Sequence, residues 1–150
     1  MGKPDATREE VVAAAKAACC HDFIAALPAG YDTPVGSGGS TLSGGEKQRI
    51  SIARAILKDA PIILMDEALA SIDPENAFAI QKGLDTLTKG KTVVMIAHTL
   101  SYIRFADQIV VMDGGKIAEI GTHDDLLTRE GLYMDMWEKE HMMKSWTLHV

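Results

Sequence analysis

The chain has 150 residues, of which 47% are hydrophobic, and its 15 Lys and Arg residues against 21 Asp and Glu residues give a formal net charge of −6. This length and apolar content suffice for one domain with its own core, whereas the acidic balance argues against a nucleic-acid partner, because such a surface needs a basic stripe. The longest apolar runs, VVAAA (11–15) and VVMIA (93–97), are far shorter than the roughly 18 residues that a membrane span needs, so we expect no transmembrane segment in this chain.

The first forty residues are expected to form two helices and then a loop. Thr7 and Glu10 have the spacing of a capping box ahead of VVAAAKAA, which is rich in good helix formers. A short helix, HDFIAAL (21–27), is expected to end at the proline that follows it, and a glycine-rich loop comes next. The only cysteines, Cys19 and Cys20, are adjacent, which favours buried thiols in a reducing cytosol over a zinc site.

The stretch TLSGGEKQRI (41–50) places two glycines, Gly44 and Gly45, at the start of a predicted helix. Glycine in a helix is unfavourable by about 1 kcal/mol relative to alanine, so its presence needs a reason. One explanation is a helix start alone, in which Ser43 caps the helix and Glu46 completes a capping box. The other is an anion site, in which the glycines let a phosphate approach the N–H groups at the helix N-terminus. The motif by itself leaves both explanations open.

After this helix, which is expected to end near Leu57, the pattern predicts a βαβ unit and therefore an α/β fold. IILM (62–65) and TVVMIA (92–97) are short continuous apolar runs, which are typical of strands buried on both faces in a parallel sheet. Between them, Asp73 and Pro74 have the character of an N-cap and a first-turn proline. The helix that follows is expected to place four apolar residues on one face: Ala77, Ile80, Leu84 and Leu87.

The last third of the chain is expected to contain a hairpin followed by helices. The predicted elements are, in order, a short helix near 101–105, a third strand at 108–112, a tight turn at Asp113-Gly114-Gly115, an exposed strand at 116–120, a helix capped by Thr122 and Asp125 that runs through Leu127, and a final helix at 131–143.

Polar residues follow both predicted parallel strands directly. Asp66 and Glu67 come after the first strand, and His98 comes after the second. In open α/β sheets, reactive groups gather at the carboxyl edge of the strands. Each residue alone could be an ordinary loop residue, but together with the glycine-rich helix start they favour a functional site.

Three segments resemble the motifs of an ATP-binding cassette (ABC) ATPase. LSGGEKQR (42–49) is similar to the signature, IILMDEALASID (62–73) to the Walker B motif and D-loop, and IAHTL (96–100) to the H-loop. GTHDDLLTREGLYMDMW (121–137) resembles the tail of exporter-type cassettes. The resemblance implies a partial P-loop NTPase (RecA-like) parallel-sheet core with an N-terminal α-helical subdomain. It implies a single partial cassette over 1–150, with a helical signature subdomain at 1–60 and the Walker B, D-loop and H-loop half of the catalytic core at 61–150.

The resemblance also implies roles for individual residues. Two cassettes of the family pack head to tail, with ATP between the phosphate loop of one and the signature of the other. The implied roles are nucleotide binding in trans for Leu42, Ser43, Gly44, Gly45 and Glu46, Mg²⁺ binding through water for Asp66, general-base catalysis for Glu67, a γ-phosphate hydrogen bond for His98, and communication between the two sites for Asp73 in the D-loop.

The phosphate-loop pattern GxxxxGK[ST] does not occur in these 150 residues. The resemblance implies the family's strand order, in which the strand that leads into the phosphate loop lies between the strands at 92–97 and 108–112, so we expect a gap in the sheet there. Two functions therefore compete. One is the C-terminal part of an ABC exporter's cassette, which couples Mg·ATP hydrolysis to transport and works with an identical or different second cassette and with transmembrane domains, at the cytoplasmic face of the plasma membrane. The other is a non-catalytic binding module or inactive fragment that donates only its LSGGE signature to a partner cassette.

Overall fold

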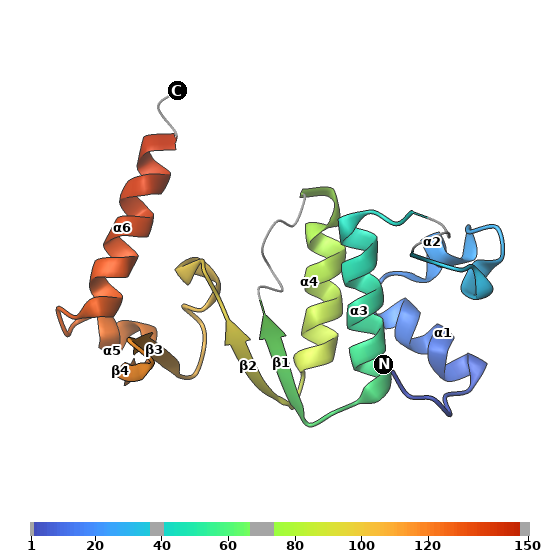
Figure 1. Cartoon of the computed structure of the whole chain (residues 1–150), viewed down its shortest axis with the longest axis horizontal. Helices are drawn as coiled ribbons and strands as arrows, with labels where there is room; N and C mark the ends of the chain where they lie inside the picture. The colour runs from blue at the N-terminus through green and yellow to red at the C-terminus, as the bar shows by residue number, and fades with distance from the viewer. Residues whose placement is uncertain (1, 37–40, 67–73, 148–150) are drawn as a thin grey trace. The chain divides into compact units, whose positions relative to one another are not determined.

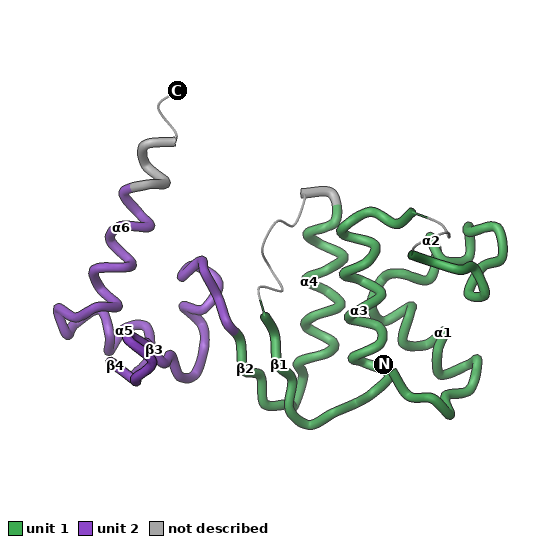
Figure 2. The backbone as a smooth tube through the Cα atoms, viewed as in Figure 1, with its two compact units in different colours: residues 1–95 green, residues 96–150 purple. Residues whose placement is uncertain are grey.

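The computed structural model describes residues 2–36, 41–66 and 74–147 and divides the chain into two compact units, Met1–Met95 and Ile96–Val150 (Figure 2). The division that the motifs suggest, between residues 60 and 61, follows sequence signatures rather than contacts and stays a prediction. The first unit contains α1 (Arg8–Ala17), α2 (His21–Ala25), the 3-10 helix η1 (Gly30–Asp32), α3 (Gly44–Lys58), β1 (Ile62–Asp66), α4 (Pro74–Thr88) and most of β2 (Thr92–Ile96) (Figure 1).

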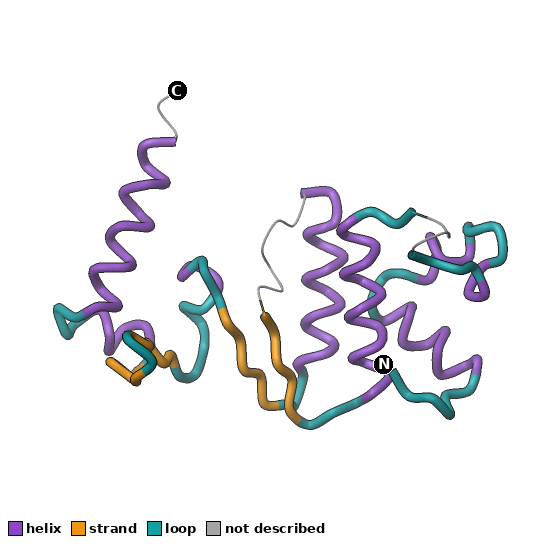
Figure 3. Tube along the Cα trace, viewed as in Figure 1, coloured by secondary structure: helices purple, strands orange, loops and turns teal. Residues whose placement is uncertain are grey.

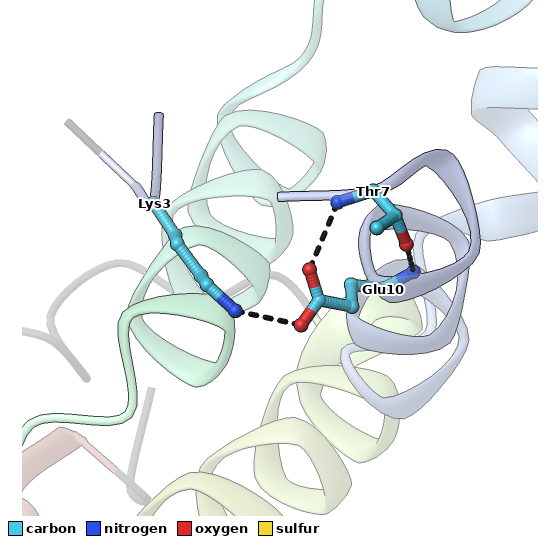
Figure 4. Close-up of polar contacts among 3 residues, drawn as sticks. All are labelled: Lys3, Thr7 and Glu10. Carbon is cyan, nitrogen blue, oxygen red and sulfur yellow. Dashed lines mark hydrogen bonds and ion pairs between the residues drawn. The ribbon is translucent and has the colours of Figure 1, made fainter. Parts of the chain in front are cut away.

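The start of α1 is stabilised by the capping box that the sequence predicts. Figure 4 shows Glu10 between two donors: the backbone N–H of Thr7 donates to one carboxylate oxygen at 2.8 Å, and Nζ of Lys3 lies 2.6 Å from the other. In return, the backbone N–H of Glu10 donates to the Thr7 hydroxyl at 3.2 Å. The Lys3 hydrogen bond, and then the Thr7 N–H, hold the pKa of Glu10 below its ordinary value.

The expected βαβ unit is confirmed. β1 and β2 pair in a two-stranded sheet, their arrows point the same way, and α4 connects them (Figure 1). The helices and strands of the first compact unit share one hydrophobic core, in which the buried residues are Ala15, Ala18, Cys20, Ile24, Ile52, Ile63, Met65, Ile80, Leu84 and Leu87. Both cysteines are free thiols, with Cys20 buried and Cys19 half-buried.

The prediction that both strands are buried on two faces is wrong. Along β1, Ile63 and Met65 are buried, whereas Ile62 and Leu64 are 60% and 78% exposed. Along β2, exposed residues alternate with half-buried ones. The cause is that α3 and α4 contribute to a core on one face of the sheet only. A strand covered on one face alternates between buried and exposed residues because its side chains point to opposite faces in turn.

On α4, the buried face differs from the predicted one at a single position. Ile80, Leu84 and Leu87 are buried as expected, but Ala77 is exposed and Gly83 is buried. A Cβ built on Gly83 would lie 3.2 Å from Cγ2 of Ile52, so the absence of a side chain lets α4 pack closely against α3. The face is thus the i, i+3, i+4, i+7 pattern that starts at Ile80.

The second unit contains η2 (Leu100–Tyr102), β3 (Ile109–Asp113), β4 (Lys116–Gly121), α5 (His123–Leu127) and α6 (Leu132–Thr147), all marked by type in Figure 3. β3 and β4 form an antiparallel hairpin in which Asp113 pairs with Lys116. Gly114 and Gly115, at the turn, have φ of 54° and 75°, and two consecutive positive φ angles are what a two-residue hairpin turn requires. The final helix extends four residues beyond its predicted end at residue 143.

The hairpin is a sheet separate from the pair β1–β2 in the described part of the chain. The gap expected between the strands at 92–97 and 108–112 stays a prediction. A second hydrophobic core, formed by Leu100, Ile109, Val111, Leu126 and Tyr133, holds η2, the hairpin, α5 and α6 together.

Candidate nucleotide-binding site

The signature segment forms a capped helix start at α3. Ser43 is the N-cap: its hydroxyl accepts a hydrogen bond from the backbone N–H of Glu46 at 3.2 Å, and a carboxylate oxygen of Glu46 accepts from the backbone N–H of Ser43 at 2.8 Å. Leu42, the residue before the cap, is 7% exposed and so anchors the turn. The capping box predicted from the sequence is therefore present, and it holds the first turn of a 15-residue helix.

The two glycines of this turn have different surroundings. A Cβ built on Gly45 would lie 2.7 Å from Cγ and 2.9 Å from Cβ of Asn76, so the packing of α3 against α4 leaves no room for a side chain there. A Cβ built on Gly44 would meet no atom within 4 Å, and its φ is not in the left-handed region. Nothing in the described part of this chain therefore requires glycine at position 44, whereas position 45 has an intramolecular reason.

The acidic residues of the predicted Walker B motif lie at the end of β1. Asp66 is the last residue of the strand, and its side chain is exposed. Glu67 and Asp73 lie outside the described residues, so their roles stay predictions. Where the structure describes the chain, no three His, Cys, Asp or Glu side chains gather into a metal-binding group. An exposed carboxylate at a strand end suits Mg²⁺, which proteins often bind through one or two carboxylates together with waters and substrate phosphates.

His98 belongs to the second unit and follows β2 by two residues. Its side chain is exposed, and the chain then enters η2 at Leu100, which is 6% exposed in the second core. Two contacts next to the predicted site residues are not predictable from the sequence: Asn76 against Gly45, and Glu140 of α6 with η2. Neither residue stands in a recognisable motif, and only spatial proximity reveals them.

The helix start, the strand-end carboxylate and the histidine after the neighbouring strand are the groups that make this chain resemble an ATP-binding cassette. A family model described as ABC transporter matches residues 3–70. YgaD of Bacillus subtilis (strain 168), which carries the name of a multidrug export ATP-binding/permease protein, is 50% identical over 142 residues, or 95% of this chain and 24% of YgaD. The mycobactin import ATP-binding/permease protein IrtA of Mycolicibacterium smegmatis is 52% identical over 138 residues, or 92% of this chain and 16% of IrtA.

A solved structure extends the likeness to the fold. The structure of a bacterial Atm1-family ABC exporter with ATP bound matches this chain with a TM-score of 0.80 and 49% identity, over 93% of this chain and 24% of that one. The chain is therefore similar to part of the ATP-binding cassette of ABC transporters, and its fold is a partial P-loop NTPase core with helices at the N-terminal side. It spans about a quarter or less of the length of these relatives.

Proposed function

We propose that this chain is the C-terminal part of a cassette that couples Mg·ATP binding and hydrolysis to transport across a membrane. The observation that carries the proposal is the signature turn. It presents the start of a long helix, where N–H groups and the helix dipole favour an anion, and Gly44 lies there with open space around its Cα. Nothing in the described part of the chain requires glycine at this position, and the close approach of a phosphate bound to a second cassette would explain it.

The proposed chemistry at the strand ends is phosphoryl transfer to water. The carboxylate of Glu67 takes a proton from the attacking water as its oxygen bonds to the γ-phosphorus, and the bond from that phosphorus to the bridging oxygen breaks to release ADP. Asp66 would hold Mg²⁺ through water, and the bound ion would supply positive charge that neutralises the phosphates. His98 donates a hydrogen bond to the γ-phosphate, and Asp73 connects the site with its counterpart in the second cassette.

The proposed partners are a second cassette, identical or different, and the transmembrane domains of an exporter. The names of the relatives, ATP-binding/permease proteins, support a link to membrane-spanning domains. The proposed location of the cassette is the cytoplasmic face of the plasma membrane. In the part of the chain that the structure describes, no helix is both long and apolar enough to cross a membrane. Export is proposed from the names of YgaD and the Atm1-family exporter, although IrtA is named for import.

A second function, donation of the signature alone, is favoured by one observation. The 150 residues contain no GxxxxGK[ST] sequence, so this stretch by itself has no phosphate loop of the usual kind. A stretch of this kind can still present Leu42–Glu46 to a partner cassette that carries its own phosphate loop, because the signature acts in trans.

Two experiments separate these functions. In the first, the cassette segment that precedes the matched region of YgaD is fused ahead of residue 1, and Mg·ATP-dependent phosphate release is measured with and without Glu67→Gln. The catalytic proposal expects release that Glu67→Gln nearly abolishes, while ATP-dependent dimerisation persists. Equal turnover in the Glu67→Gln fusion would remove Glu67 as the base.

In the second experiment, the unfused chain is added to a complete YgaD cassette whose own signature has been inactivated by substitution. Donation in trans expects phosphate release to return, to be lost with Gly44→Val, and to be unaffected by Glu67→Gln, since that residue belongs to the other site. Failure of the chain to restore any release would refute donation of the signature.

A further inference from the structure

One carboxylate of α6 holds the turn that follows His98. The backbone N–H of Leu100 donates to Oε2 of Glu140 at 2.6 Å, and the hydroxyl of Ser101 donates to Oε1 of the same side chain at 2.8 Å. Both donors belong to η2, and Glu140 lies 40 residues away from Leu100 in the sequence. Hydrogen bonds to an ionised acceptor are short and strong, so this pair of bonds ties η2 firmly to α6.

The packing of α6 directs Glu140 towards η2. Tyr133, which is 1% exposed, and Trp137 pack in the second core, and Glu140 follows them at i+7 and i+3, on the same face of the helix. Leu100 lies in that core as well. The contact between Glu140 and η2 is therefore supported by apolar packing of both partners and does not depend on two solvated side chains meeting at the surface.

Glu140 also supplies a cap that η2 lacks from its own sequence. The residue before η2, Thr99, makes no side-chain capping hydrogen bond, and a helix start needs acceptors for its first N–H groups. Thr99 is the only residue between His98 and the anchored Leu100. An anchor so close on the C-terminal side limits the backbone positions that His98 can adopt.

We propose that Glu140 is a positioning residue for His98 and that α6 thereby regulates the position of His98 in the nucleotide site. The hydrogen bond from His98 to the γ-phosphate rests on the proposed function, whereas the positioning of His98 by Glu140 does not require a bound nucleotide. A change in the packing or position of α6 is transmitted through one carboxylate to the turn beside His98.

The test is NMR on the full chain without nucleotide. Backbone order parameters and amide hydrogen exchange are measured in the wild type and in Glu140→Ala, Glu140→Gln and Ser101→Ala. The matched control is Glu138→Ala, which removes the same charge from an exposed position on α6. Val111, buried in the same core, reports whether that core stays intact.

We expect Glu140→Ala to lower the order parameter of His98 from a rigid value of about 0.85 to below about 0.6. The amide exchange of Leu100 should become at least about tenfold faster, while Val111 is unchanged. Glutamine should restore both values, because its amide can accept from the Leu100 N–H and donate to the Ser101 hydroxyl. Ser101→Ala should shift His98 in the same direction by a smaller amount, and Glu138→Ala should behave as the wild type.

The proposal is overturned if His98 keeps its order in Glu140→Ala, or if Glu138→Ala changes His98 equally. If Glu140→Ala fails to fold, Ser101→Ala decides: lowered order at His98 supports the proposal, and unchanged order overturns it. Phosphate release by the YgaD fusion tests the proposed function separately, so failure of one is distinguishable from failure of the other.

Discussion

Alanine at position 45 is expected to destabilise the chain relative to alanine at position 44. The two glycines are neighbours in the first turn of α3, so both substitutions gain a similar helix-propensity term, up to about 1 kcal/mol. The difference between the two variants therefore isolates the packing of the new methyl group. At Gly44 that group meets nothing within 4 Å, whereas at Gly45 it would lie 2.7 Å from Cγ and 2.9 Å from Cβ of Asn76.

The size of the difference follows from the clash. A real Cβ does not approach another carbon this closely, and the Cβ of Asn76 cannot swing away as the end of a long side chain can, so α3 and α4 must separate slightly. Overpacking of this kind costs about 1–3 kcal/mol. For a chain of this length, each 1 kcal/mol corresponds to about 2–4 °C in the melting temperature, so Gly45→Ala should melt about 2–12 °C below Gly44→Ala.

The assay is thermal and urea unfolding of the two variants, followed by circular dichroism. Addition of Asn76→Ala to Gly45→Ala removes Cγ and Nδ2 but leaves Cβ, so the double variant should recover part of the loss. A Gly45→Ala variant that melts at or above the temperature of Gly44→Ala would refute the packing argument.

Gly44→Ala should meanwhile lower the phosphate release that the chain supports in trans, although it keeps or gains stability.

Three further predictions concern local interactions. Ser43→Ala should lower the free energy of unfolding by about 1 kcal/mol, and Glu46→Ala added to it should lower it little further, because both residues form one capping box. A double-mutant cycle in urea measures this coupling, and additive losses would contradict a shared box. Burial raises the pKa of the Cys20 thiol from 9.0 to about 11. Between these pH values the unfolded chain loses the proton first, so the free energy of unfolding falls as pH rises. Urea unfolding should show a shallower fall in Cys20→Ala, and an identical slope would exclude this thiol as the cause. The Lys91 ammonium, 2.8 Å from Oδ1 of Asp59, holds the pKa of that carboxyl below its usual range. Lys91→Ala should therefore raise the pKa of Asp59 in an NMR titration, and an unchanged pKa would argue against the ion pair.

The elements that the sequence predicted well depend on neighbouring residues. Capping boxes at Thr7, Ser43 and Thr122 lie where the spacing placed them, because each involves residues three apart. The hairpin turn at Gly114 and Gly115 was equally predictable, since few residues accept consecutive positive φ angles. The order of helices and strands followed from such local signals and from hydrophobic periodicity.

Burial was less predictable, because it depends on what covers an element. IILM has the pattern of a strand buried on both faces, but Ile62 and Leu64 are exposed, since the core of the described chain lies on one face of the sheet. On α4, Gly83 is buried where Ala77 was expected to be, because the close approach of α3 leaves room only for a residue without a side chain. A hydrophobic side chain favours burial, but the arrangement of the neighbouring elements decides whether the residue is buried.

For the candidate site, the sequence by itself determined which chemical groups follow each strand and begin α3: Asp66, His98 and the Ser43–Glu46 turn. Glu67 and Asp73 stand on the motif alone, because they lie outside the described residues. Only the tertiary structure distinguished Gly45, which packs on Asn76, from Gly44, and only the structure brought Glu140 to η2. The physical reason is range: caps and turns are set by bonds between residues a few positions apart, whereas these contacts join segments that come together only when the helices pack around a common core.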